Sequence, residues 1–155
     1  MIKVNVNVSE KNWKKYIKSP ETYIKSKIKN IKTKKNLFKN KKVEFSLMLS
    51  GGDEIKKFNN LFRNKDKTTD VLSFPFYEKK VIKKFIKTKN NFYLGDVIIN
   101  LKKVENRKLN SIDKNKLNKL WIHGFLHLIG NTHKTNKAFE KMQRLEKKLF
   151  SLIKK

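Results

Sequence analysis

The chain has 155 residues, a length typical of one domain built around one hydrophobic core. Its 40 Lys and Arg residues against 13 Asp and Glu residues give a formal net charge of +27, which favours a polyanionic partner such as RNA, DNA or an anionic membrane. The absence of cysteine excludes disulfides and thiolate chemistry, so any metal site must be built from His, Asp or Glu.

The charge alone does not identify the partner. A general preference for lysine at the surface, in a chain that is also rich in Asn and Ile, explains any single lysine equally well. No uncharged apolar run is long enough to cross a bilayer, and the N-terminus alternates apolar and polar residues where a secretory signal has a continuous apolar segment. We therefore expect a cytoplasmic protein with no membrane partner.

The N-terminal quarter is predicted to contain a strand, two helices and a loop. Residues 1–8 alternate apolar and polar side chains, as a strand does. Ser9 suits the N-cap of a first amphipathic helix with apolar residues at helical spacing, namely Trp13, Tyr16 and Ile17. Pro20 suits the first position of a second helix, whose apolar stripe continues to Ile31. The lysine-rich stretch 32–42 is then a loop.

The middle of the chain is predicted to alternate strands with one helix. Alternating or short apolar runs bounded by turn residues predict strands at residues 43–49, 71–74 and 92–99. A glycine-rich turn leads into a helix that Asp53 caps and that ends near Arg63. The Lys-rich segment 77–90 is predicted to be an excursion, with a hairpin arm as one form.

The last third is predicted to be helical, with a short piece around Val104 and longer helices at 111–129 and 136–153. Gly130 is well placed to end the first of these long helices. The order of the elements predicts an α+β fold, a single domain of residues 1–155 with a mixed, mainly four-stranded sheet covered by about five helices.

All three histidines of the chain lie within one short stretch, at His123, His127 and His133. On a helix, His123 and His127 are about one turn apart, so both imidazoles project from the same face. Gly130 breaks this helix and lets the chain turn back, so that His133 can reach the other two. Three imidazoles on Zn²⁺ leave a fourth position for water, as in catalytic zinc sites. The pattern therefore predicts one catalytic Zn²⁺ per chain at the end of this helix.

Two other interpretations stay open. The histidines could be gathered by chance, or they could hold a structural zinc whose fourth ligand is Asp96 or Glu140. The stretch also differs from the H-E-x-x-H helix of metalloproteases, because Gly124 stands where the general base would be. This difference argues against a protease or a small-molecule hydrolase and leaves activation of water to the metal.

The stretch His123-Gly124-x-Leu126-His127-Leu128-x-Gly130, followed by His133, resembles the signature of the YbeY-type endoribonucleases, the ribosomal RNA maturation factors. Two more blocks resemble the family in order and spacing. They are Phe62-Arg63-Asn64-Lys65-Asp66-Lys67-Thr68-Thr69-Asp70-Val71-Leu72-Ser73-Phe74-Pro75 and Leu94-Gly95-Asp96-Val97-Ile98-Ile99. Together the blocks span residues 62–133.

The resemblance implies a zinc-dependent endoribonuclease that favours single strands, matures the 3′ end of small-subunit ribosomal RNA and takes part in ribosome quality control. By motif position, His123, His127 and His133 would bind the zinc. Arg63 would be the family's functionally important arginine, which can clamp a phosphate and neutralise its charge. The implied partners are single-stranded regions of ribosomal RNA and proteins of the small ribosomal subunit.

The chain departs from the family pattern at Asn131 and Thr132, where relatives usually have an aromatic residue or His and then Asp. A carboxylate there could orient a ligand imidazole, whereas threonine offers only a hydroxyl. Asp96 and Asp70 are the candidates for this outer role, although either could instead cap a turn.

Base stacking could underlie the preference for single strands, with Phe74, Phe76 and Tyr77 as candidates. For Phe74, packing in the core is the favoured interpretation. The alternative to an enzyme is a ribosome assembly factor that binds RNA and whose zinc only fastens the C-terminal helices.

Overall fold

The computed structural model describes residues 1–34, 38 and 40–154. Its centre is a four-stranded sheet with the strand order β1–β2–β4–β3. The strands are β1 (Ile2–Val8), β2 (Lys42–Ser50), β3 (Val71–Pro75) and β4 (Asn91–Asn100). β1, β2 and β4 are parallel, and β3 pairs antiparallel with β4 at one edge. The mixed four-stranded sheet predicted from the sequence is therefore confirmed.

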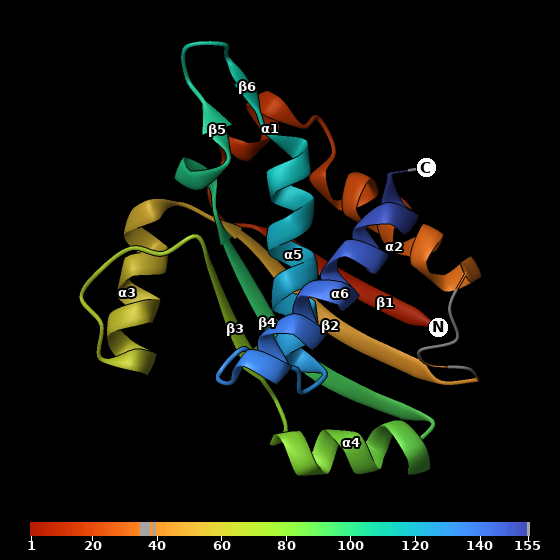
Figure 1. Cartoon of the computed structure of the whole chain (residues 1–155). Helices are drawn as coiled ribbons and strands as arrows, with labels where there is room; N and C mark the ends of the chain where they lie inside the picture. The colour runs from red at the N-terminus through yellow and green to blue at the C-terminus, as the bar shows by residue number, and fades with distance from the viewer. Residues whose placement is uncertain (35–37, 39, 155) are drawn as a thin grey trace.

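Six α-helices surround the sheet within the described residues. They are α1 (Trp13–Tyr16), α2 (Pro20–Lys34), α3 (Gly52–Arg63), α4 (Lys79–Thr88), α5 (Lys114–Leu128) and α6 (Asn136–Ile153). A 3₁₀ turn, η1 (Leu101–Lys103), and a small hairpin of β5 (Glu105–Asn106) and β6 (Ser111–Ile112) lead from β4 to α5, as Figure 1 shows. The α+β class is confirmed, with one helix more than expected. In the part of the chain that the structure describes, every helix is too short or too polar to pass through a bilayer.

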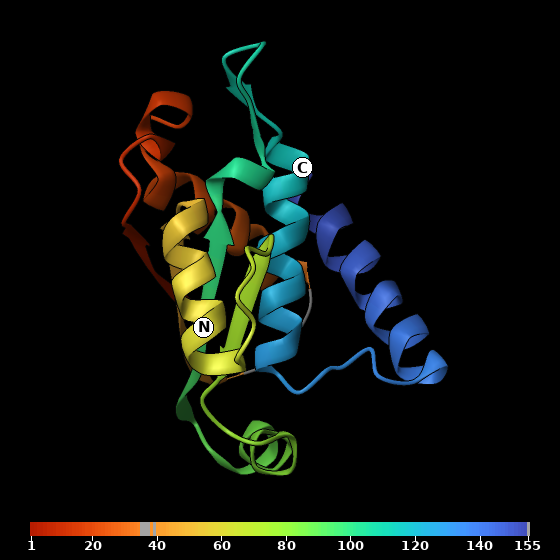
Figure 2. The ribbon, with the colours of Figure 1, turned by 90° about the vertical axis from the view of Figure 1, so that its left-hand side faces the viewer.

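The helices cover the two faces of the sheet with different layers (Figure 2). α5 packs on β3 and β4 and α2 packs on β1, with α6 against both helices. This layer encloses the main core, whose largest buried side chains include Trp13, Phe45, Trp121 and Phe125. α3 packs on the opposite face of β3 and β4, over a second, smaller cluster of Ile55, Leu72 and Ile98. The part of that face formed by β1 carries the exposed side chains of Asn5 and Asn7.

The alternation of buried and partly buried side chains along β2 explains how the register of the strands is fixed. Its residues Val43, Phe45, Leu47 and Leu49 are all completely buried, and the residues between them are only partly buried. A shift of one residue in the pairing would expose this whole set, so the register is strongly specified. β4, in the centre, is buried on both faces along its second half, as expected for a central strand.

Two predicted helix caps were wrong. α1 has Asn12 at its N-cap position, and the Ser9 hydroxyl donates instead to the Glu54 carboxylate at 2.5 Å. α3 begins one residue before Asp53, with Gly51 as its N-cap. Asp53 lies in the first turn, where its negative charge still interacts favourably with the helix dipole. In both places the side chain of capping type contacts another residue: Ser9 contacts Glu54, and Asp53 forms an ion pair with Lys102 at 3.9 Å.

The Lys-rich segment predicted as an excursion contains the helix α4, so the prediction of a hairpin arm there was wrong. Ile82 is buried, and Phe85 and Ile86 pack on the main core. Their spacing of three and four residues places them on one face of the helix. The predicted loop at 32–42 was also partly wrong, because α2 continues to Lys34; residues 35–37 and 39 lie outside the described part of the chain.

Candidate metal centre

α5 carries two of the histidines, and its orientation is fixed by its start and by its buried face. Asp113 caps the helix, because its Oδ1 accepts a hydrogen bond from the Lys116 amide at 2.9 Å. The indole N–H of Trp121 donates to Asn118 at 3.0 Å. The Asn118 amide in turn donates to the hydroxyl of Tyr23 on α2, also at 3.0 Å. These contacts hold α5 in one rotation on the sheet, with His123 partly exposed at its rim.

Gly124 lets α5 approach the sheet closely. A Cβ atom at this position would lie 2.5 Å from Cγ1 of Val97 on β4 and 3.1 Å from the Ser73 hydroxyl on β3. Real Cβ atoms essentially never come as close as the first of these distances, so only glycine fits here. Position 124 therefore faces the sheet, and no side chain at this position could act on a substrate at the histidines.

The chain turns back sharply after α5, as predicted. Gly130 has φ +85°, a left-handed conformation that glycine adopts at little cost. Its amide donates to the His127 carbonyl at 2.9 Å, and the Asn131 amide donates to the Leu126 carbonyl at 3.0 Å. The side chain of Asn131 adds a second hydrogen bond to Leu126, at 3.1 Å. Asn131 thus stabilises the end of the helix through both its backbone and its side chain.

The turn brings the third histidine to the other two. The ring centroid of His133 lies 5.0 Å from that of His127 and 5.6 Å from that of His123. The Nε2 atoms of His123 and His127 are 3.0 Å apart. One nitrogen from each of the three rings lies within 4.8 Å of the others, a group that could hold a metal ion. The predicted convergence of the three side chains is therefore confirmed.

The outer nitrogens of the two helical histidines are held by the protein. Nδ1–H of His127 donates to the Asn131 carbonyl at 3.0 Å. Nδ1–H of His123 donates to the carboxylate of Glu146 on α6 at 2.6 Å. A neutral imidazole that donates from Nδ1 presents a lone pair at Nε2. Both Nε2 atoms therefore face the centre of the cluster, where each ring can present its lone pair to a metal ion.

The residues present fit a zinc ion. The Nε2 atoms of His123 and His127 lie 3.0 Å apart and face each other, and an ion between them could accept the lone pairs of both rings. Zinc–nitrogen bonds of about 2.05 Å in a tetrahedral arrangement separate two ligand nitrogens by roughly 3.3 Å. This value is close to the 3.0 Å between the Nε2 atoms of His123 and His127. The pKa of His127 is lowered to about 4, chiefly by burial and also by the charges of His123, His133 and Arg63, against the opposing effect of the Asn131 hydrogen bond. His127 is thus a neutral ring at physiological pH, as a metal ligand must be.

Glu146 was not among the carboxylates named from the sequence. Asp70 forms ion pairs with Lys103 and Lys116 at 3.8 and 3.9 Å, and Asp96 accepts a hydrogen bond from the Tyr93 hydroxyl at 2.9 Å. The outer role expected for Asp96 or Asp70 is instead taken by Glu146. Its signal in the sequence is a carboxylate within the apolar stripe of α6, four residues after Met142 and three before Leu149, both buried.

A fourth protein ligand is absent from the cluster among the described residues. Asp96 and Glu140, the candidates for closing a structural site, are not part of the group of converging ligand atoms. Glu140 is exposed on the first half of α6. This arrangement disfavours a closed structural site and leaves room for solvent or substrate, as in a catalytic zinc site.

Arg63, the last residue of α3, reaches around the edge strand toward the cluster. Its Nη2 donates to the Ser73 carbonyl of β3 at 3.0 Å, and its guanidinium carbon lies 5.9 Å from the ring centroid of Phe74. Its positive charge is close enough to contribute to the low pKa of His127. The structure therefore brings Arg63 into the electrostatic environment of the histidines while the residue stays exposed to solvent.

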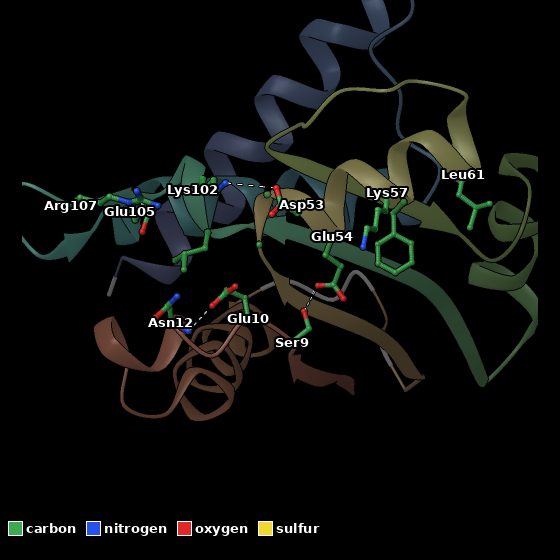
Figure 3. Close-up of a pocket in the computed structure, with 14 residues that line it drawn as sticks. Ser9, Glu10, Asn12, Asp53, Glu54, Lys57, Leu61, Lys102, Glu105 and Arg107 are labelled. Atoms are coloured by element: carbon green, nitrogen blue, oxygen red, sulfur yellow. Dashed lines mark hydrogen bonds and ion pairs between the residues drawn. The ribbon is translucent and has the colours of Figure 1, made fainter.

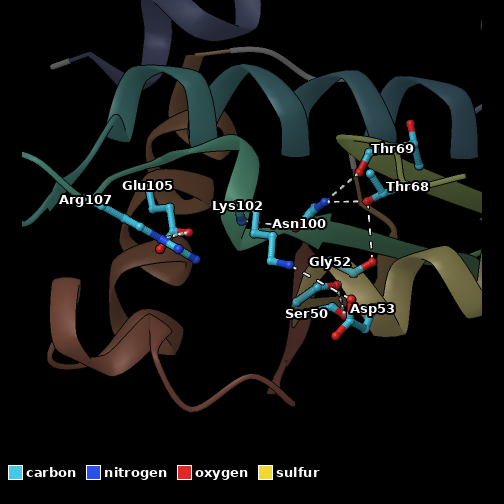
Figure 4. A network of polar contacts seen from close by, with 10 residues as sticks. Ser50, Gly52, Asp53, Thr68, Thr69, Asn100, Lys102, Glu105 and Arg107 are labelled. Carbon is cyan, nitrogen blue, oxygen red and sulfur yellow. Dashed lines mark hydrogen bonds and ion pairs between the residues drawn. The ribbon is translucent and has the colours of Figure 1, made fainter.

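A cavity of about 640 Å³ lies away from the histidines, where β1, β2 and β4 end and α3 begins (Figure 3). Its acidic residues already have partners. Glu54 accepts hydrogen bonds from Ser9 and Ser50 at 2.5 Å, and Glu105 pairs with Arg107 at 2.9 Å. Beside it, the buried Asn100 joins a polar network that ties β4 to the loop after α3 (Figure 4). These contacts stabilise the fold, so we do not assign the site to this cavity.

Three converging imidazoles without a thiolate, on an α+β domain, are typical of metal-dependent hydrolases. The sequence profile of the family "Endoribonuclease YbeY" matches residues 6–154 of the chain. An "Endoribonuclease YbeY" from Pelagibacter ubique is 43% identical over 99% of this chain and 97% of its own length. Another, from Leptospira interrogans, is 32% identical over 66% of this chain and 81% of its own length.

The fold agrees with these matches. The solution structure of a Thermotoga maritima protein superposes with a TM-score of 0.59, at 25% sequence identity, and the match covers 99% of this chain and 89% of that protein. The chain therefore belongs to the YbeY family of endoribonucleases.

Proposed function

We propose that the chain cleaves single-stranded RNA with one Zn²⁺ held by His123, His127 and His133. The convergence of three imidazole nitrogens within 4.8 Å, in a member of an endoribonuclease family, is the observation that carries this proposal. When bound, zinc would supply a Lewis acid for the phosphate and would lower the pKa of a water ligand to about 7. The other steps depend on the side chains of the chain itself.

The groups of the chain around the metal site have distinct roles in the proposal. The Asn131 carbonyl and the Glu146 carboxylate hold the rings of His127 and His123 with their Nε2 atoms directed inward. Arg63 would bind the phosphate at the scissile bond and stabilise the charge that develops on it. The chain carries 40 Lys and Arg residues, which would attract the strand through its phosphates, so binding should weaken steeply with salt.

The biological substrate in this proposal is ribosomal RNA. We infer that the chain helps to mature the 3′ end of the small-subunit RNA, acts in ribosome quality control and contacts proteins of the small subunit. Membership of the YbeY family supports this inference. Comparing the 3′ ends of small-subunit RNA in cells with and without the protein tests it directly.

The chemical proposal is tested on the pure protein. Metal analysis of the wild-type chain and of His127→Ala should show about one zinc per wild-type chain and none in the variant. Both proteins are then incubated with single-stranded and duplex RNA, and we expect cleavage of the single strand by the wild-type chain alone. The Glu140→Gln variant, altered at an exposed residue of α6, is the matched control.

The same experiment separates the enzyme from an assembly factor with a structural zinc. In the enzyme, His127→Ala abolishes cleavage while the circular dichroism spectrum and the affinity for RNA persist. With a structural zinc, the fold and RNA binding would be lost together with the metal. Undiminished cleavage by His127→Ala would refute the proposed site.

A further inference from the structure

α3 ends in a row of aromatic side chains that continues onto β3. Phe58 and Phe62, one helical turn apart, stack with ring centroids 6.1 Å apart. Phe62 meets the ring of Phe74 edge-on at 5.3 Å. Phe58 and Phe74 pack on the second buried cluster and are anchored there. Phe62 is held by these two neighbours but stays 59% exposed.

This row forms one wall of a groove of about 550 Å³ on the face of the sheet that α3 covers only in part. The polar side chains that line the groove are Asn5, Asn7, Ser46 and Asp96. None of the described residues that line it is a lysine or an arginine, although the chain has 40 of them. Such an interior offers aromatic faces and hydrogen-bond acceptors, which suit a nucleobase, and it offers no cation for a phosphate.

The charge that suits a phosphate lies at the rim of the groove. Arg63 follows Phe62 directly, and its guanidinium carbon is 5.9 Å from the centroid of Phe74. It is also hydrogen-bonded to the carbonyl of Ser73, whose side chain lies on the α5 side of the sheet beside Gly124. Arg63 therefore connects the groove on one face with the histidines beside the other face.

The carboxylate in the groove has a defined position beside the aromatic row. Asp96 is the register partner of Phe74 in the pairing of β3 with β4. Its Oδ1 accepts a hydrogen bond from the Tyr93 hydroxyl at 2.9 Å, so its second oxygen can accept from another donor. The amino and imino N–H groups on the edges of nucleobases are such donors, whereas a phosphate would be repelled.

We propose that Phe62 and Phe74 form a stacking site for one unpaired nucleobase of the RNA strand. The phosphate next to this base lies at Arg63, and the strand continues past the edge strand β3 to the histidines. A base can enter the groove only when it is unpaired, so this site would exclude duplex RNA. The proposal rests on the proposed function for its ligand, and it adds the residues that select single strands.

The test compares two neighbouring exposed residues of α3. Leu61 is 72% exposed and lines the other cavity, whereas Phe62 lines the groove. Equilibrium binding of a single-stranded oligoribonucleotide is measured with chelator present, so that no cleavage is involved. We expect Phe62→Ala to weaken binding roughly 5- to 150-fold, the range that corresponds to the loss of one stacked base. Leu61→Ala should bind like the wild-type chain, and Phe62→Trp should retain most of the affinity.

A second ligand, which lacks the bases but keeps the phosphate charges, serves as a control. An abasic ribose–phosphate strand of the same length should bind all four proteins with equal affinity, because it has nothing to stack. Equal losses for Phe62→Ala and Leu61→Ala, or a loss for Phe62→Ala that persists on the abasic strand, would overturn the proposal. The proposal would also be overturned if Phe62→Ala weakened the binding of a lysine-rich peptide and left the affinity for RNA unchanged, since the groove would then be a peptide site. Because binding is measured without cleavage, a failed nuclease assay leaves this result interpretable.

Discussion

Two polar regions of the same domain differ in how their hydrogen-bonding groups are used. At the carboxyl ends of the parallel strands, the Asn100 amide donates to the Thr68 hydroxyl at 2.9 Å and to the Thr69 carbonyl at 3.1 Å. Its Oδ1 accepts from the Lys102 amide at 3.0 Å. In the histidine cluster, the Nδ1 atoms of His123 and His127 are also hydrogen-bonded, but their Nε2 atoms face each other.

The comparison shows that burial by itself does not mark a functional site. Asn100 is completely buried and fully satisfied, whereas His133 is exposed. A polar group whose partners are all within the protein contributes stability. Several nitrogen acceptors directed at one point can instead bind a metal ion from outside. Substitutions should therefore separate the two regions: those in the network should change stability, and those in the cluster should change the affinity for metal.

The largest expected effect is the loss of a ligand nitrogen from the cluster. His127→Ala should lower the affinity for zinc more than the roughly 10–100-fold that the loss of an outer partner costs. Adding a chelator to the zinc-loaded wild-type chain should lower its free energy of unfolding by about 2.7 kcal/mol when zinc was present at 100 times its Kd. The variant should not respond to the chelator in thermal denaturation. A chelator effect of the same size in His127→Ala would place the metal elsewhere.

Removal of the carboxylate behind His123 should have the next largest effect. Glu146→Ala should weaken zinc binding roughly 10- to 100-fold, because the ring of His123 is no longer held and its Nε2 becomes less basic. Glu146→Gln should recover part of this loss, since its amide oxygen can still accept from Nδ1–H. Competition with a metal indicator dye measures both affinities. If both variants bind zinc as tightly as Glu140→Gln, Glu146 does not position the ring.

A substitution in the hydrogen-bond network of Asn100 should have the opposite effect, lowering stability and leaving the affinity for zinc unchanged. Asn100→Ala removes the acceptor of the Lys102 amide and the donor to the Thr68 hydroxyl and the Thr69 carbonyl, and should lower the free energy of unfolding by about 1–3 kcal/mol. Urea denaturation measures this change, and zinc affinity should stay at the wild-type value. A weaker zinc site with unchanged stability would contradict the structural role that we give to this region.

The smallest effect is expected at Asp70, whose side chain is 43% exposed. Its ion pairs with Lys103 and Lys116 lie near the surface, where such pairs contribute about 0–1 kcal/mol. Asp70→Asn should change the free energy of unfolding by less than about 1 kcal/mol and leave zinc affinity unaltered. A drop in zinc affinity comparable to that of Glu146→Ala would show that Asp70 takes part in orienting the histidine ligands.

Local patterns predicted the parts of the site that lie close together in the sequence. His123 and His127 are spaced by one helical turn, and Gly130 ends the helix, so the positions of all three histidines followed from short-range rules. The bounds of α6 were predicted in full because its apolar stripe is regular and its N-cap, Thr135, lies just outside it. Here the local and the tertiary preferences agree.

Longer-range features could not be predicted in the same way. Glu146 is 23 residues from His123, and its role depends on how α6 crosses α5, which no local pattern specifies. The groove beside Phe62 depends on the open half of a sheet whose strand order is set by pairing between distant segments. α4 was missed although Ile82, Phe85 and Ile86 carry a helical spacing, because the lysines around them suggested a solvated arm.

The close approach of α5 to the sheet limits the reactions that this site can acquire by mutation. Metalloproteases place a glutamate beside the first histidine of the helix, and here that position is Gly124. A side chain there would meet Val97 and Ser73 and would push the helix away from the strands, moving His123 and His127 with it. No single substitution at this position can therefore convert the site into a peptidase, and its evolution is confined to chemistry in which the base comes from elsewhere.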